Sequence, residues 1–203
     1  EERLKRDKPV FLYTIPVFHN PAGGTLSSGR REQLIGLSDQ YDFFVVADEV
    51  YQLLHYASTP PPPLTYYDVS QRVLSLGSFS KILAPGLKLG WMQAKPNSLS
   101  PFCGCGYLDS GGGLNPFVSS IVGSALELGL QESYLQKLKK NYQDRLATLS
   151  SALRHHIPRL KFREPSGGYF IWARLPEGAD SEFLLAEAEE YKVRFKPGIN
   201  FSC

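Results

Sequence analysis

Three short stretches of the sequence place chemically active side chains directly after apolar runs. These side chains are Asn20 in HNPAGG, Asp48 and Tyr51 in ADEVY, and Ser78, Ser80 and Lys81 in GSFSK. An amine held beside a bound ligand can act as a nucleophile, and hydroxyls and backbone amides at a turn can bind an anion. The same residue types also form ordinary turns and helix caps, so each stretch alone is ambiguous.

The apolar runs before these stretches predict a parallel sheet. The expected strands are Val10–Val17, Phe43–Val50 and Arg72–Gly77. Each is short and rich in β-branched and aromatic residues, and the runs are apolar enough to be covered by helices on both faces. Gly29–Tyr41 is predicted to be a helix, capped by Ser27 or Ser28. Open parallel sheets bind ligands at the carboxyl ends of their strands, which is where the three stretches fall.

The second half of the sequence is different in character. We expect a glycine-rich loop at Gly104–Gly113, a helix from Pro116 to about Leu130, and then a longer amphipathic helix. The apolar positions of this longer helix, spaced by three or four, are Leu135, Leu138, Tyr142, Leu146, Leu149 and Leu153. Two strands around a glycine turn at Phe162–Pro176, a helix at Ser181–Tyr191 and the start of a strand in Val193–Cys203 complete the prediction.

These elements suggest two partial domains of a larger protein. Residues 1–130 are expected to form part of an α/β domain, and residues 131–203 part of an α+β domain entered by the long helix. The first strand follows only a short charged segment, and the last element has no strand to pair with.

Composition excludes several other classes of protein. The formal net charge is only +2, which gives no electrostatic reason to expect nucleic acid as a partner. No apolar run approaches the roughly 20 residues of a membrane helix. Three cysteines and four histidines lack the spacing of a disulfide framework or a metal site, so we expect no metal and an intracellular, cytoplasmic location.

Taken in order, the stretches resemble one enzyme family. HNPAGG, ADEVY, SFSKILAPGLKLGW and PSGGYFIWARLP are similar to segments of the fold-type I, class I/II aminotransferases, which use pyridoxal 5'-phosphate. Within that family the sequence is most similar to the aminoadipate- and kynurenine-type branch. The resemblance implies the large cofactor-binding domain of that fold, followed by its small domain.

The resemblance also implies roles for the residues that match. Lys81 would form a Schiff base with the cofactor aldehyde and carry a proton, and Asp48 would keep the ring nitrogen protonated. Tyr51 and Asn20 would hydrogen-bond the ring oxygen. The phosphate would be held by Ser78, Ser80 and Lys88.

Two departures from the family pattern limit these assignments. Lys88 stands where the family usually has an arginine, and a lysine offers a point charge in place of a planar fork. The residues that stack on the cofactor ring and bind the substrate carboxylate would lie before Glu1 and after Cys203.

The expected activity is amino-group transfer between an amino acid and a 2-oxo acid, in a homodimer. Two alternatives remain open: a pyridoxal-phosphate lyase of the same fold, and a non-catalytic fragment or sensor domain. The segment Gly104–Gly113 would be either a loop near the substrate entrance or a plain connector.

Overall fold

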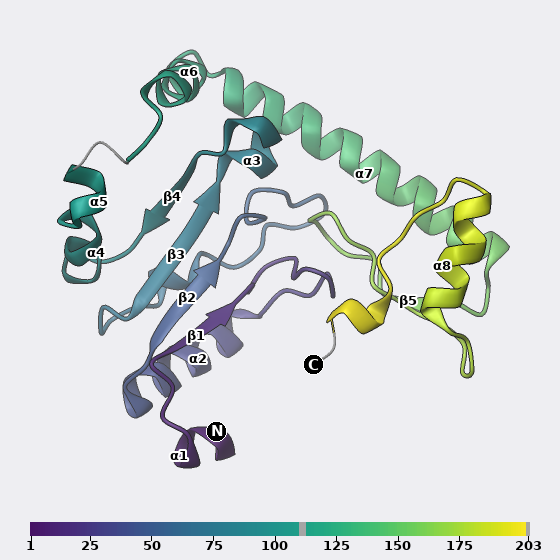
Figure 1. The fold of residues 1–203 in the computed structure, drawn as a ribbon, viewed down its shortest axis with the longest axis horizontal. Coiled ribbons are helices and arrows are strands. Elements are labelled where there is room, and N and C mark those ends of the chain that lie inside the picture. Colours follow the sequence, from purple (N-terminus) through teal and green to yellow (C-terminus); the bar gives the residue numbers. More distant parts are fainter. Residues whose placement is uncertain (110–112, 202–203) are drawn as a thin grey trace.

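The computed structural model describes residues 1–109 and 113–201 (Figure 1). The strands are β1 (Phe11–Thr14), β2 (Phe44–Asp48), β3 (Val73–Ser78), β4 (Gly90–Gln93), β5 (Lys161–Phe162) and β6 (Ala173–Arg174). The α-helices are α1 (Glu2–Arg6), α2 (Ser28–Tyr41), α3 (Phe79–Ile82), α4 (Pro96–Cys103), α5 (Gly106–Asp109), α6 (Pro116–Glu127), α7 (Leu130–His156) and α8 (Ser181–Glu190). Three 3-10 helices are η1 (Leu64–Tyr66), η2 (Pro85–Leu87) and η3 (Gly198–Phe201).

The main sheet has the strand order β1-β2-β3-β4. Strands β1, β2 and β3 are parallel, as the sequence predicts, while β4 runs antiparallel to β3 and was not predicted. Gly77 allows this pairing, because a Cβ there would lie 2.1 Å from the Trp91 ring of β4. The parallel strands all end at the same edge, so the segments after Thr14, Asp48 and Ser78 emerge together.

Helix α2 covers one face of the sheet. Ser27 caps this helix by accepting a hydrogen bond from the Arg30 amide at 3.4 Å. Ile35 of α2 packs in a buried cluster with Val45 and Ala47 of β2 and Val73 of β3. Because side chains alternate along a strand, the residues between these buried positions face the other side.

The opposite face of the sheet carries large side chains that remain exposed. Phe11 is 58% exposed, Tyr13 52% and Phe44 40%. In the parallel register Phe11 pairs with Phe44 and Tyr13 with Val46, so all of them share the face to which Asp48 also belongs.

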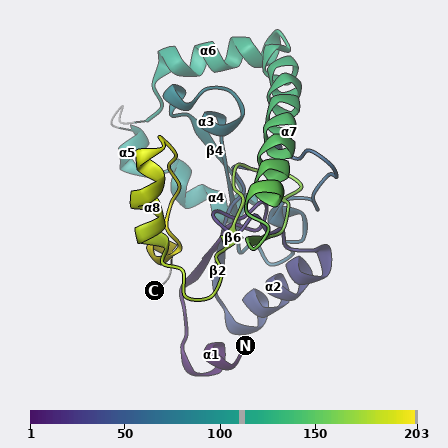
Figure 2. The same ribbon diagram turned by 90° about the vertical axis from the view of Figure 1, so that its right-hand side faces the viewer.

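Helices α6 and α7 form where a helix and then a longer amphipathic helix were expected, with a sharp turn between them (Figure 2). Gly129 has φ +66°, a left-handed conformation that favours glycine, and it separates the two helices. Leu135 of α7 packs against Tyr51 and Ile82, so the long helix lies over the segments that follow β2 and β3. Within residues 1–109 and 113–201, no helix is long and apolar enough to cross a membrane.

The C-terminal part departs from the predictions in two places. The strand predicted in Val193–Cys203 is wrong over the described residues 193–201, where η3 closes by a hydrogen bond from Asn200 N–H to Pro197 O at 3.2 Å. Pro197 cannot donate to a strand ladder and favours this turn. The predicted strands in Phe162–Pro176 are reduced to the two-residue pair β5 and β6.

Further differences concern connections. The expected loop Gly104–Gly113 contains helix α5, and residues 110–112 lie outside the described residues, as does Cys203. The predicted boundary between residues 130 and 131 stays a prediction.

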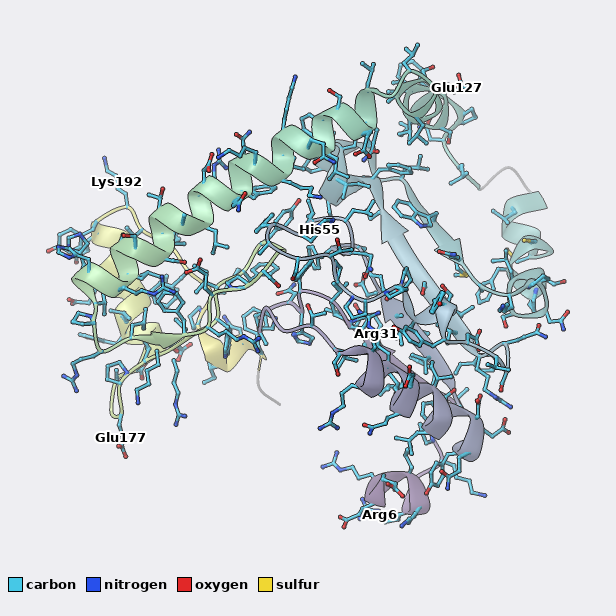
Figure 3. The ribbon with its side chains drawn as sticks, turned by 180° about the vertical axis from the view of Figure 1, so that it is seen from behind. Arg6, Arg31, His55, Glu127, Glu177 and Lys192 are labelled. Atoms are coloured by element: carbon cyan, nitrogen blue, oxygen red, sulfur yellow. The ribbon has the colours of Figure 1, made fainter. Side chains whose placement is uncertain are left out.

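A buried arginine ties the carboxyl ends of the strands together. Arg31 of α2 is fully buried and donates hydrogen bonds to Glu49 at 3.0 Å and to three carbonyl oxygens, those of Pro16, Leu26 and Pro62. Figure 3 shows Arg31 where α2 meets the strands. Pro16 and Leu26 lie at the two ends of the connection between β1 and α2, while Glu49 and Pro62 lie in the connection between β2 and η1, so one guanidinium fixes two connections.

Glu49, which directly follows β2, completes this network. Its carboxylate accepts hydrogen bonds from Ser75 Oγ at 2.6 Å and from the Leu64 amide at 3.1 Å. Burial raises the pKa of Glu49, while the donors of Ser75, Leu64 and Arg31 oppose that rise. The carboxylate is 6% exposed and depends on these partners to replace water.

We predict that Arg31→Met strongly destabilises the fold, because it leaves the Glu49 carboxylate buried without its cation. Breaking a buried pair in this way costs about 3–5 kcal/mol of unfolding free energy. Urea unfolding followed by circular dichroism measures the loss. Arg30→Met, at the exposed neighbouring position, is the matched control and should change stability by less than about 0.5 kcal/mol. Equal stability of the two variants would contradict the role given to Arg31.

Candidate functional site

The predicted site residues gather at the carboxyl edge of the parallel strands. Asp48 is the last residue of β2, and Ser78 is the last residue of β3. Asp48 pairs in register with Leu76, two residues before Ser78. Lys81 follows in the short helix α3, which begins directly after β3.

One carboxylate oxygen of Asp48 accepts a hydrogen bond, and the other has no donor among the described residues. Tyr13 donates a hydrogen bond from its hydroxyl to Asp48 Oδ2 at 2.6 Å. Oδ1 is buried and has no hydrogen-bond partner among the described residues. Partial burial, together with the hydrogen bond and negative charge of Asp48, raises the pKa of Tyr13 to about 12. A buried acceptor without a donor is costly, so this oxygen fits a ligand that brings an N–H group.

Tyr51 is held by aromatic contacts close to Asp48. It is 5% exposed, and its ring makes edge contacts with Tyr169 at 5.5 Å and with Phe170 at 6.1 Å between centroids. Burial, followed by the charge of Asp48, raises the pKa of Tyr51 above its ordinary value. The hydroxyl therefore keeps its proton at neutral pH and can serve as a donor.

Lys81 is anchored through its backbone and keeps a partly exposed side chain. Ser78 caps α3, its Oγ accepting a hydrogen bond from the Ser80 amide at 3.2 Å. Tyr169 donates from its hydroxyl to the Lys81 carbonyl oxygen at 2.5 Å. Tyr13 is thus linked to Asp48 by a hydrogen bond, Asp48 acts on Tyr51 through its charge, and Tyr51 contacts Tyr169, which bonds the Lys81 backbone.

Asn20 and Lys88 lie in turns beside this series of interactions. Asn20 belongs to a tight turn after β1, closed by a hydrogen bond from Gly23 N–H to His19 O at 2.6 Å. Lys88 is exposed, with φ +50°, at the turn between α3 and β4. Its neighbour Leu89 accepts a hydrogen bond from the Phe79 amide at 3.0 Å, which keeps this turn near Ser78 and Ser80. The roles of these residues stay predictions.

Segment 165–170 lies within the stretch PSGGYFIWARLP, which the sequence indicated as family-like, but none of its residues was predicted to belong to the site. Tyr56 N–H donates to Ser166 O at 2.8 Å, and Gly168 N–H donates to Leu54 O at 2.9 Å. A Cβ on Gly167 would lie 2.4 Å from Leu54 O, so only glycine permits this approach. The glycine pair was visible in the sequence as a turn signal, but its docking onto a distant loop was not.

Tyr13 was also missed as a site residue. It lies inside the apolar run predicted as a strand, where a tyrosine is an ordinary strand residue. Tyr13 pairs with Val46, two residues before Asp48, and finding it from the sequence would have required this register of β1 with β2.

The described residues offer no metal centre. Among residues 1–109 and 113–201, no three His, Cys, Asp or Glu side chains gather as ligands. Cys103 and Cys105 are free and exposed.

Comparison with known proteins identifies the family. The model of the family "Aminotransferase class I and II" matches residues 2–203, and the chain belongs to this family.

The similar proteins include several named aminotransferases. The chain is 37% identical to aromatic-amino-acid aminotransferase 1 of Thermococcus litoralis, covering 99% of this chain and 48% of that protein. It is 32% identical to 2-aminoadipate transaminase of Thermus thermophilus, covering 98% of this chain and 50% of that protein. The crystal structure of kynurenine aminotransferase from Pyrococcus horikoshii superposes with a TM-score of 0.87 at 35% identity, covering 97% of this chain and 50% of that one.

These matches confirm the fold class and the resemblance to the aminoadipate- and kynurenine-type branch. The chain spans about half the length of the curated relatives it matches.

We predict that Gly167→Ala loosens segment 165–170 from the loop at residues 54–56, because the added Cβ meets the Leu54 carbonyl oxygen, a backbone atom that cannot yield. Thermal unfolding should show a loss of a few kcal/mol, within the range of overpacked sites at about 1–3 kcal/mol. Gly36→Ala in α2 is the matched control, since nothing lies within 4 Å of its Cβ position. Stability that is unchanged in Gly167→Ala would show that the segment does not dock as described.

A pH effect is expected at the same junction. His55, beside α7 in Figure 3, lies 3.0 Å from Lys139 Nζ through its Nε2. Burial, and next the charge of Lys139, lowers the pKa of His55 from its ordinary value of 6.5. Below pH 6.5 the unfolded chain binds a proton at His55 more readily than the folded chain does. The stability that the neutral His55 gives the fold is therefore present above pH 6.5 and is lost as the pH falls through the folded pKa.

Urea unfolding at pH 7.5 and pH 5.0 measures this effect. His55→Gln keeps a hydrogen-bond acceptor but does not titrate, so its stability should fall less between the two pH values than that of the unmodified chain. His156→Gln, at an exposed position, should behave like the unmodified chain. An equal fall in His55→Gln would contradict this assignment.

Proposed function

We propose that this chain supplies the pyridoxal 5'-phosphate site of an aminotransferase, and that Lys81 is its nucleophile. The observation that carries the proposal is the series of interactions that links Tyr13, Asp48, Tyr51 and Tyr169 to the Lys81 backbone, in which Asp48 acts on Tyr51 through its charge. It brings an amine, a carboxylate and a phenol to one sheet edge, in a chain that belongs to the class I and II aminotransferases.

The residues present fit this cofactor. The buried, unpartnered Asp48 Oδ1 suits the protonated nitrogen of a pyridine ring, which would satisfy it. The Ser78 and Ser80 hydroxyls lie at the start of α3 and suit phosphate oxygens, with Lys88 as a nearby cation. Asn20 and Tyr51 would donate to the ring oxygen. When bound, pyridoxal phosphate acts as an electron sink for a carbanion at the substrate α-carbon.

Each of the site residues would then have a defined role. The Lys81 amine would attach covalently to the cofactor aldehyde with loss of water, and after displacement by substrate it would move the α-proton. Asp48, as an anion, would hold the proton on the ring nitrogen. Tyr51 would orient the ring through its hydroxyl while its own position is fixed by Tyr169 and Phe170.

The substrate class follows from the same proposal. We expect an amino acid and a 2-oxo acid, since the relatives include proteins named for aromatic amino acids and 2-aminoadipate. A homodimer and a cytoplasmic location belong to this proposal too; the exposed free thiols of Cys103 and Cys105 fit a reducing compartment. A lyase would use the same cofactor residues, so product analysis must separate the two.

The first experiment is trapping of the cofactor on the chain. Borohydride reduction of the chain mixed with pyridoxal phosphate, followed by peptide mapping, should label Lys81. Lys81→Ala should lose at least nine-tenths of the label, and the exposed control Lys137→Ala should keep it. Scattered labelling of surface lysines would contradict the proposal and favour a non-catalytic module. Formation of a 2-oxo acid with consumption of an added one distinguishes transfer from elimination.

A further inference from the structure

The hydrogen bond between Tyr13 and Asp48 is not explained by the cofactor contacts assigned above. Tyr13 comes from β1 and Asp48 from the end of β2, and Tyr13 lies opposite Val46 in the register. Both side chains therefore stand on the sheet face opposite α2, with Tyr13 reaching forward by two residues to Asp48.

We propose that Tyr13 is a positioning residue that turns Asp48 Oδ1 toward the cofactor ring and keeps the Asp48 carboxylate in its anionic form. This inference rests on the proposed function. It adds a residue outside the three sequence stretches, acting on the cofactor only through Asp48.

The geometry supports this role in two ways. First, the Tyr13 hydroxyl occupies Oδ2 at 2.6 Å, so the carboxylate cannot rotate freely and Oδ1 is the oxygen left for a ligand. Second, a carboxylate can only accept in this pair, and the phenol is the donor. A phenol is protonated at neutral pH already at its ordinary pKa of 10, and burial and Asp48 raise the pKa of Tyr13 further, to about 12.

The effect of Tyr13 on the cofactor would come from competition for one proton between Asp48 and the ring nitrogen. That proton can reside on the carboxylate oxygen or on the pyridine nitrogen. A hydrogen bond to the carboxylate favours its charged form over its neutral form, and so leaves the proton on nitrogen. Replacing the phenol by a phenyl ring removes that bias and leaves Oδ2 without a partner.

A purely structural role for Tyr13 makes a different prediction. Tyr13 is 52% exposed, and its ring contributes little to the buried clusters. If only its packing mattered, Tyr13→Phe would retain the ring and leave the cofactor unaffected. The decisive variant is therefore Tyr13→Phe, which removes only the hydroxyl oxygen and its proton.

The experiment compares the unmodified chain, Tyr13→Phe, Asp48→Asn and the double variant, each loaded with pyridoxal phosphate labelled with ¹⁵N in the ring. We expect Tyr13→Phe to weaken cofactor binding by about tenfold, the scale of one hydrogen bond to a charged group. Its ring ¹⁵N resonance should shift toward the unprotonated position. In the Asp48→Asn background, Tyr13→Phe should have no further effect on either measurement.

The experiment has two controls, and two different outcomes would contradict the two proposals. Tyr191→Phe, at a position 80% exposed, should match the unmodified chain. 1-Deazapyridoxal phosphate, with carbon in place of the ring nitrogen, should bind to Tyr13→Phe as well as to the unmodified chain. Normal binding and an unchanged ¹⁵N shift in Tyr13→Phe would overturn this inference alone. No binding of pyridoxal phosphate to the unmodified chain would overturn the proposed function and this inference with it.

Discussion

The arrangement of the site depends on the buried ion pair between Arg31 and Glu49. Its donors and acceptors come from α2, from the segments after β1 and β2, and from β3, so the loops at the carboxyl edge have one common point of attachment. Buried pairs of this kind add little net stability compared with apolar replacements, but they are costly to break. Their effect here is to define where each loop leaves the sheet.

Asp48 and Glu49 illustrate how a strand end separates two carboxylates. Consecutive side chains of a strand point to opposite faces, so Glu49 enters the buried network while Asp48 turns to the open face with Tyr13. The Glu49 carboxylate accepts hydrogen bonds from several protein donors, whereas Asp48 keeps one oxygen without a partner among the described residues. The sequence ADEVY thus contains a structural acid and a candidate ligand-binding acid in adjacent positions.

Helices and strands were predicted well where a pattern of neighbouring residues is enough to form them. The three apolar runs and the capped helix at Ser28–Tyr41 depend on nearby residues, and they form close to the expected bounds. The stretches with Asp48, Ser78 and Lys81 also lie at one edge, because parallel strands impose it. Strand β4 was missed because Gly90 and Trp91 form a strand only through pairing with Gly77 and Ser78.

Contacts between distant segments account for the rest of what was missed. Tyr169 reaches the Lys81 carbonyl oxygen across 88 positions in the chain, and no local pattern announces such a contact. Likewise, a strand was expected after Val193 although the sequence showed no strand to pair with it. The described chain supplies none for residues 193–201, and the turn at Pro197 prevails.

The docking of segment 165–170 has a mechanical consequence. Because its backbone is hydrogen-bonded to residues 54–56 and Tyr169 is bonded to the Lys81 carbonyl oxygen, this segment is tied to the loop after β2 and to α3. Strand β5 precedes this segment in the chain, and β6 and α8 follow it. A displacement of these elements would therefore leave the Lys81 backbone in place as long as the hydrogen bonds of segment 165–170 hold.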